Sequence, residues 1–179
     1  LGSNAYGYGI SPVIAADGTI YTNGIASYTR NGYTDDNTNS LYAINPDGST
    51  KWIYNAISPG GVSGIGTLIP ALDLAGNIYL GGKVNDLWST SAFFALNPSG
   101  NLLWSYEMPQ TDYFGKSSPA VDVNGVIYFG ATNYLYALNP NGTLKWKLPT
   151  DIGGSSPAIG SNGTLYFGSG DGYLNAIGN

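Results

Sequence analysis

The acidic side chains are the residues of this sequence that could catalyse a reaction, and that reaction would be hydrolysis. Cleavage of a glycosidic bond uses two carboxyl groups held a defined distance apart across a cleft. Glu107 and Asp112 lie in one segment, which Asp86 or Asp151 could approach from neighbouring segments. Glu107 is the only glutamate in the chain. Because acidic groups are so few and no other catalytic pattern accompanies them, we expect no enzymatic activity.

A second acidic group, in the segment YTDDNTNS, could bind calcium. Asp35 and Asp36, with the amides of Asn37 and Asn39, carry the oxygen atoms that Ca²⁺ prefers as ligands. The segment lacks the spacing of an EF-hand loop and the bidentate glutamate at its end. We therefore expect a solvated loop here and no bound metal.

Cysteine and histidine are absent from all 179 residues. Their absence excludes zinc sites built on thiolate or imidazole ligands, and Ser-His-Asp or Cys-His catalysis in their usual forms. The net charge is −5 and Arg30 is the only arginine, so we expect no basic surface for nucleic acid. The sequence contains no run of about 18 apolar residues, so we expect no membrane-spanning helix.

Aromatic side chains could bind a ligand without catalysis. Flat rings beside Asn and Asp suit sugar stacking or contact with a protein. Trp88 is the strongest single candidate because it lies outside every repeated pattern described below. The further candidates are Tyr28, Tyr33, Tyr106, Tyr113 and Phe114. The alternative is that these rings only pack long loops against the rest of the domain.

Two repeated frames indicate the elements that would position these side chains. A frame of ten residues, with Trp nine residues after Ala, recurs as AINPDGSTKW, ALNPSGNLLW and ALNPNGTLKW at 43–52, 95–104 and 137–146. A lead frame, in which Gly and Tyr follow Pro by six and nine residues, recurs at 11–21, 69–79, 118–128 and 156–166. An internal repeat sets the architecture of a chain, so one copy of the repeat predicts the structure of the others.

The repeat at 118–146 has the pattern of a four-stranded antiparallel meander. Its four short runs are rich in β-branched and aromatic residues, and Asn124-Gly125 and Asn139–Gly142 are turn signals between them. In such a meander the first-to-second and third-to-fourth turns lie at one edge, and all other connections lie at the opposite edge. These other connections are the long ones, at 22–40, 54–68, 81–92 and 105–117. Since function commonly lies on variable loops held by a rigid frame, we predict the binding surface at that edge.

Repeated four-stranded sheets that pack face to face in a ring form a β-propeller. The pattern A-L-N-P-x-G-x-x-x-W after S-P-A-x-x-x-x-G-x-I-Y resembles the quinoprotein-type, or PQQ-like, propeller repeat over nearly the whole chain. The resemblance implies that Trp52, Trp104 and Trp146 dock each blade on the next. It does not imply activity, because we can place no counterpart of the calcium ligands, catalytic Asp or vicinal disulfide of quinone-dependent dehydrogenases. We therefore expect no cofactor.

The frames predict an all-β chain with about four blades, at approximately 10–54, 68–106, 117–148 and 155–179, of which the last lacks its outer strand. Four blades in a row would leave two packing faces open, which is a large apolar surface of a kind that monomers avoid. We therefore expect the segment to belong to a larger or assembled ring, completed by further blades, by further copies or by a protein partner.

The sequence predicts a non-catalytic scaffold or binding module of a secreted or cell-surface protein, in an extracellular or periplasmic location. Charged residues are only 9% of the chain, against a usual ~25%, and Tyr, Asn, Ser and Thr are abundant. The first alternative is a carbohydrate-binding propeller that holds a glycan with Trp88 and the neighbouring tyrosines. The second is a fragment of a quinone-dependent dehydrogenase or of a hydrolase.

Overall fold

The structure is a computed structural model that describes residues 11–30, 33–55, 69–83, 91–114, 117–152 and 154–178. For 25–30, 33–39 and Lys83 it describes the backbone alone. These residues form fifteen strands and no helix, so the described part of the chain has no helix that could cross a membrane. The predicted all-β class is confirmed.

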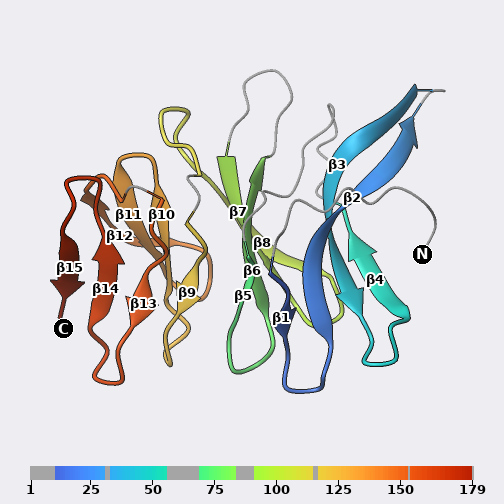
Figure 1. Ribbon diagram of the computed structural model, residues 1–179, viewed down its shortest axis with the longest axis horizontal. Helices are drawn as coiled ribbons and strands as arrows, with labels where there is room; N and C mark the ends of the chain where they lie inside the picture. The colour runs from blue at the N-terminus through green and yellow to red at the C-terminus, as the bar shows by residue number, and fades with distance from the viewer. Residues whose placement is uncertain are drawn as a thin grey trace.

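The strands form four antiparallel sheets, the blades, and within each blade consecutive strands pair. Blade 1 has β1 (Val13–Ile14), β2 (Ile20–Arg30), β3 (Tyr33–Ile44) and β4 (Thr50–Tyr54); blade 2 has β5 (Ala71–Leu72), β6 (Ile78–Lys83), β7 (Ser91–Leu96) and β8 (Leu102–Glu107). Blade 3 has β9 (Ala120–Val121), β10 (Ile127–Ala131), β11 (Tyr134–Leu138) and β12 (Leu144–Pro149); blade 4 has β13 (Ala158–Ile159), β14 (Leu165–Gly168) and β15 (Leu174–Ile177). Figure 1 shows the blades side by side in one row. The predicted propeller architecture is confirmed.

The short turns at the lower edge of Figure 1 share one geometry. Between β9 and β10, Asp122 N donates to Val126 O (3.0 Å) and Gly125 N donates to Asp122 O (3.0 Å). The Asp122 carboxylate accepts further bonds from the backbone N–H groups of Asn124 and Val126. Gly125 has a φ of 77°, which glycine adopts without the steric cost of a Cβ. The frame therefore needs glycine here, and the hairpin loop has three residues with glycine last.

The core lies between the blades. Strand residues alternate between the two faces of a blade, so one face meets the preceding blade and the other meets the next. Blades 2 and 3 have the most aromatic interface: the Phe93 and Phe129 rings stack with centroids 4.4 Å apart, and Phe129 stacks on Tyr136 at 5.2 Å. Blades 1 and 2 pack through a cluster that includes Tyr21 and Phe94.

The connection at 22–40 differs from the sequence prediction of a long loop. β2 extends to Arg30, β3 begins at Tyr33, and these two residues pair with each other, so the segment is a long hairpin that projects from blade 1 in Figure 1. The polar run DDNTNS suggested a loop, but backbone pairing needs no apolar side chains. The Asn31-Gly32 pair, which lies between the two strands in the sequence, was a hairpin signal.

Candidate functional site

The loop rim is the edge at the top of Figure 1, where second and third strands are joined and where one blade connects to the next. Its residues with described side chains are 108–114, 117–119, 132–133, 150–152, 154–157 and 169–173. The sequence predicts the binding surface at this edge, and the predicted aromatic residues Tyr113 and Phe114 lie on it.

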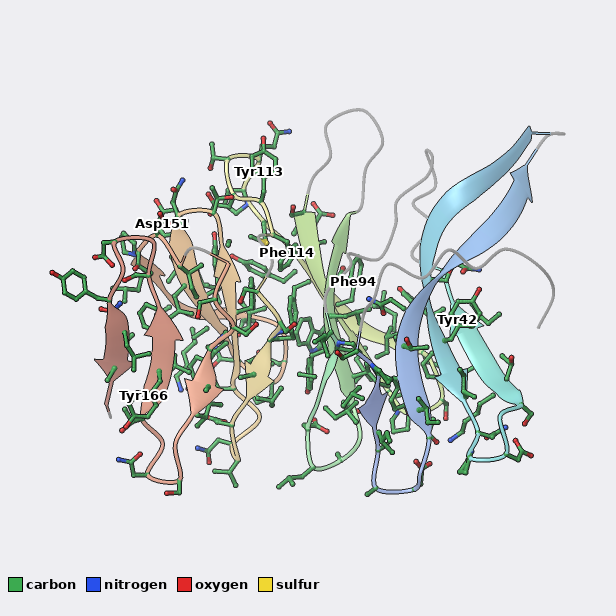
Figure 2. All side chains as sticks on the ribbon, in the orientation of Figure 1. Tyr42, Phe94, Tyr113, Phe114, Asp151 and Tyr166 are labelled. Atoms are coloured by element: carbon green, nitrogen blue, oxygen red, sulfur yellow. The ribbon has the colours of Figure 1, made fainter. Side chains whose placement is uncertain are left out.

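Tyr113 is held on the rim with its side chain exposed. The residue is 51% exposed, although both its backbone N–H and its backbone carbonyl are hydrogen-bonded to Thr132. Tyr113 O accepts a hydrogen bond from Thr132 N (2.9 Å), and Tyr113 N donates to Thr132 Oγ1 (3.3 Å). The next residue, Phe114, forms a β-bridge with Ala131. Figure 2 shows Tyr113 at the top of the molecule and Phe114 below it, so one residue faces solvent while its neighbour is anchored.

Asp112, which precedes the exposed tyrosine, is buried. It ties the connection between blades 2 and 3, called the crossing below, to blade 3. Its carboxylate accepts hydrogen bonds from the Tyr136 hydroxyl and from Thr111 Oγ1 (2.9 Å), and it forms an ion pair with Lys147 Nζ (3.5 Å). The Lys147 ammonium lies 4.1 Å from the centroid of the Tyr134 ring, a cation–π contact. We call Asp112, Tyr134, Tyr136 and Lys147 the Asp112 latch. It joins the crossing to β11 and β12.

The surroundings of the latch shift the pKa values of the Asp112 carboxyl and the Tyr136 hydroxyl in opposite directions. Burial alone would raise the pKa of the Asp112 carboxyl, but the hydrogen bonds from Tyr136 and Thr111 and the charge of Lys147 hold it below its ordinary value. Burial, and then the bond to Asp112, raises the pKa of the Tyr136 hydroxyl. At neutral pH, Asp112 is therefore an anion whose oxygen atoms are already bound within the fold.

Phe114 and Tyr106 are half-buried and contact the sheets. The Phe114 ring lies 5.9 Å from Phe93 and 5.4 Å from Phe129, between blades 2 and 3. Tyr106, in β8, meets the Tyr136 ring edge-on at 6.3 Å. These contacts are the ones expected if the rings pack the crossing against the blades.

The remaining predicted binding residues lie where their side chains are not described. Trp88 lies outside the described residues, and Tyr28 and Tyr33 are described as backbone in β2 and β3. The calcium candidates Asp35 and Asp36 are also in β3, in a strand rather than the expected loop. Among the residues that the structure describes, no three acidic side chains gather as a metal site would require.

The carboxyl groups considered for hydrolysis occupy different surroundings. Glu107 ends β8 and is exposed, whereas Asp112 is buried in the latch. Asp151 is exposed on the rim, and its carbonyl oxygen accepts a hydrogen bond from Gly170 N (2.7 Å). Asp86 lies outside the described residues.

The three frame tryptophans lie between blades. Trp52 Nε1 donates to Pro98 O (3.0 Å), and Trp104 Nε1 donates to Pro140 O (2.9 Å). Each of these two indoles thus reaches from the outer strand of one blade to the turn between the third and fourth strands of the next blade. Trp146 packs in the cluster that joins blades 3 and 4.

The docked indoles lie against glycines of the same turns. A Cβ placed on Gly100 would be 2.8 Å from a carbon of Trp52, and one placed on Gly142 would be 2.5 Å from Trp104. At the equivalent Gly48 of blade 1, no atom of the described residues would lie within 4 Å of the added Cβ. The frame glycines of blades 2 and 3 therefore serve two purposes, because each one forms the turn and also lies against an indole.

Sequence reasoning missed two residues, one on the rim and one in the latch. Tyr173, in the turn between β14 and β15, is well exposed; its place directly after the Asp171-Gly172 turn signal could have indicated this. Lys147 follows the frame tryptophan by one residue, and no sequence pattern connects it with Asp112. Only the fold brings these two charges together.

Residues 7–178 match a family model of the PQQ-like repeat that is described as "Outer membrane protein assembly factor BamB". No curated protein matches the chain. Among solved structures, a gluconolactonase from Xanthomonas campestris is 13% identical and covers 92% of this chain and 55% of its own, with a TM-score of 0.53. A protein of unknown function from Bacteroides caccae is 16% identical over 88% of this chain and 57% of its own, with a TM-score of 0.50. At these identities the likeness concerns the fold alone, and the chain spans little more than half the length of either structure.

Proposed function

We propose that this chain, which belongs to the PQQ-like β-propeller repeat family of the BamB type, is a non-catalytic scaffold that binds a protein partner on its loop rim. The observation that carries the proposal is Tyr113, an exposed ring on a fixed backbone between a buried carboxylate and a packed phenylalanine. Tyrosine is enriched among the residues that dominate protein interfaces, and an ordered residue loses little entropy on binding.

The use of the acidic groups supports a role without catalysis. The Asp73 carboxylate accepts a hydrogen bond from the Tyr79 hydroxyl at 3.0 Å, and the Asp122 carboxylate accepts one from the Tyr128 hydroxyl at 3.2 Å. Asp112 is bound in the latch. These three carboxylates hold turns and the connection between blades 2 and 3 in place, a structural use that favours a role without catalysis.

The family supports a protein as the ligand and an envelope location. Its matching model is described as an assembly factor for outer membrane proteins, and a factor of that kind acts by binding other proteins. We place this chain in the periplasm, at the cell surface or outside the cell. A low content of charged residues and many Tyr, Asn, Ser and Thr residues favour the same location.

The test compares three immobilised forms of the chain: wild type, Tyr113→Ala and Leu74→Ala. Leu74 is an almost fully exposed apolar residue at the opposite edge and is the matched control. Each form is incubated with envelope and secreted fractions of the source cells. We expect one polypeptide to be retained by wild type and Leu74→Ala, and its retention to fall on the order of tenfold or more with Tyr113→Ala, as for an interface hot spot.

Two other outcomes would contradict the proposal. Equal retention by wild type and Tyr113→Ala would exclude the rim as the binding surface. Binding to a glycan array that is lost with Tyr113→Ala would instead establish the carbohydrate alternative, in which Trp88 is the next residue to change. Both readouts use the folded chain, which a thermal melt of each variant verifies.

A further inference from the structure

The outer strands of blades 1, 2 and 3 are β4, β8 and β12, and each lies at the edge of its sheet among the described strands. An edge strand pairs on one side only, so the backbone groups on its other side are a template for a further strand. Proteins block such edges with lysine, with proline or with a bulge. The residues along the outward side therefore decide whether an outer strand can pair with another chain.

The hydrogen bonds of β8 show which of its residues face outward. Met108 N donates to Ser91 O directly beyond the ladder of β7 and β8. Hydrogen-bonded and non-hydrogen-bonded pairs alternate along an antiparallel ladder, so the backbone groups of Glu107 and Ser105 face away from β7. The bulge of this ladder lies at Leu103, between the paired residues on either side of it.

The equivalent positions of the other two outer strands carry blocking residues. These residues are lysines and one proline: Lys51 in β4, and Lys145, Lys147 and Pro149 in β12. In β8 the same positions are Leu103, Ser105 and Glu107, all exposed. The strand contains no lysine, arginine or proline, so β8 is the least blocked of the three edges.

We propose that β8 of one copy of this chain pairs antiparallel with β8 of a second copy, about a two-fold axis at Ser105. This self-association goes beyond the proposed function and does not depend on it. Two identical strands in antiparallel pairing are self-complementary, because each outward N–H meets an outward C=O of the other copy. The axis places Glu107 opposite Leu103 of the second copy, so no like charges face each other.

The side chains beside the axis also suit a second copy. Trp104 would lie opposite Tyr106 of the other copy, in the closer non-hydrogen-bonded arrangement, and aromatic cross-strand pairs of this kind stabilise sheets. Ser105, at the axis itself, is exposed and small. The same pairing of β12 would set Lys147 against Lys147 of its copy and would lack a donor at Pro149, so the geometry favours β8.

The antiparallel joint would invert one copy relative to the other. β8 runs from the lower edge of blade 2 toward the loop rim (Figure 1), so the two rims of the dimer would point in opposite directions. The dimer would then present two binding surfaces, which gives a scaffold the avidity of a bivalent protein. One strand pair is a small interface, so the association should be reversible on dilution.

Single-cysteine variants test the position of the axis, because the chain contains no cysteine of its own. The Cα atoms of a hydrogen-bonded antiparallel pair lie about 5.5 Å apart, a distance that a disulfide spans. Ser105→Cys should therefore form a disulfide-linked dimer in air, measured by non-reducing electrophoresis. Leu103→Cys is the matched control, because the two Leu103 positions of the dimer would lie roughly 14 Å apart and should not become linked.

Sedimentation velocity over a range of concentrations measures the association without a crosslink. Wild type should associate as concentration rises. Leu103→Lys, which adds the lysine of the other edges, and Ser105→Pro, which removes an outward N–H where proline is tolerated, should each raise the dissociation constant on the order of tenfold or more. Lys145→Ala, on the edge of blade 3, should leave it unchanged. A wild type that stays monomeric at about 500 μM, or equal crosslinking of both cysteine variants, would overturn the proposal.

The other possible occupant of this edge is a strand of a different protein. That occupant would leave the chain monomeric while Ser105→Pro lowers the retention of a partner, and this result would also overturn self-association. The rim experiment remains separate, because Tyr113→Ala changes no residue of β8. Loss of partner retention by Tyr113→Ala with unchanged self-association would show that the two surfaces act independently.

Discussion

Replacement of Gly142 by alanine is expected to lower the free energy of unfolding by about 3 kcal/mol. Backbone strain contributes roughly 1 to 2 kcal/mol of this loss, and overpacking contributes roughly 1 to 3 kcal/mol. Gly142 has a φ of 83°, which penalises any side chain. The new Cβ would also lie 2.5 Å from the Trp104 indole and would displace it from the Pro140 carbonyl. Gly48→Ala should cost only about 1 kcal/mol, since Gly48 has a φ of 86° and no described atom lies within 4 Å of the position of the new Cβ.

The free energies of unfolding of Gly142→Ala and Gly48→Ala are measured by urea denaturation, which is followed by circular dichroism at equal protein concentration. A double-mutant cycle sharpens the test. In a Trp104→Ala background, the additional cost of Gly142→Ala over Gly48→Ala should disappear, because the atom that clashes is gone. If both glycine substitutions cost the same in the wild-type chain, the docked indole contributes nothing to the joint.

The spacing of the frames was sufficient to predict the blades and their turns. Trp104 follows Gly100 by four residues and Ala95 by nine, and the fold uses both intervals: Trp104 pairs with Ala95 in the sheet, and Gly100 forms the turn between them. A local interval of this kind is set by strand pairing, so it can be read from one sequence. The packing of Trp52 onto Gly100 follows from repetition of the same unit.

The candidate site was less predictable because it depends on contacts between segments of different repeats. Tyr113 and Phe114 are adjacent aromatics in one crossing, and no sequence rule says that the first is exposed and the second packed. The bridge of Phe114 to Ala131 decides it. Likewise, Asp112 and Lys147 belong to a variable crossing and to an outer strand, so only the packing of blade 3 shows that they form an ion pair.

The Asp112 latch should contribute stability at neutral pH and lose it in acid. Asp112→Ala is expected to cost about 3 kcal/mol at pH 7, because hydrogen bonds to a charged group are lost and the buried Tyr136 hydroxyl is left without its acceptor. Asp112→Asn, which keeps an acceptor oxygen, should cost about half as much. Urea denaturation of wild type and both variants measures the difference.

The sign of the pH dependence follows from the lowered pKa of Asp112 in the folded chain. A carboxyl whose pKa falls on folding adds stability above its unfolded pKa of about 3.9, and this stability is lost as pH falls through the folded value. The gap between wild type and Asp112→Asn should therefore be constant from pH 5 to 8, which lies above that range, and should shrink below about pH 4. A gap that stays constant in acid would show that the Asp112 charge does not stabilise the fold.

The latch is also expected to affect the proposed partner binding, because Asp112 directly precedes Tyr113 in the chain. Hydrogen exchange of the Thr132 amide, which donates to Tyr113 O, should accelerate in Asp112→Ala, and retention of the rim partner should fall although Asp112 is buried. Lys147→Met is the matched variant: it removes the ion pair but leaves the Tyr136 hydrogen bond to Asp112, so it should give an intermediate effect on both. Unchanged amide exchange in Asp112→Ala would mean that the Thr132 contacts alone hold Tyr113, and the latch would then be a stabilising element without a role in binding.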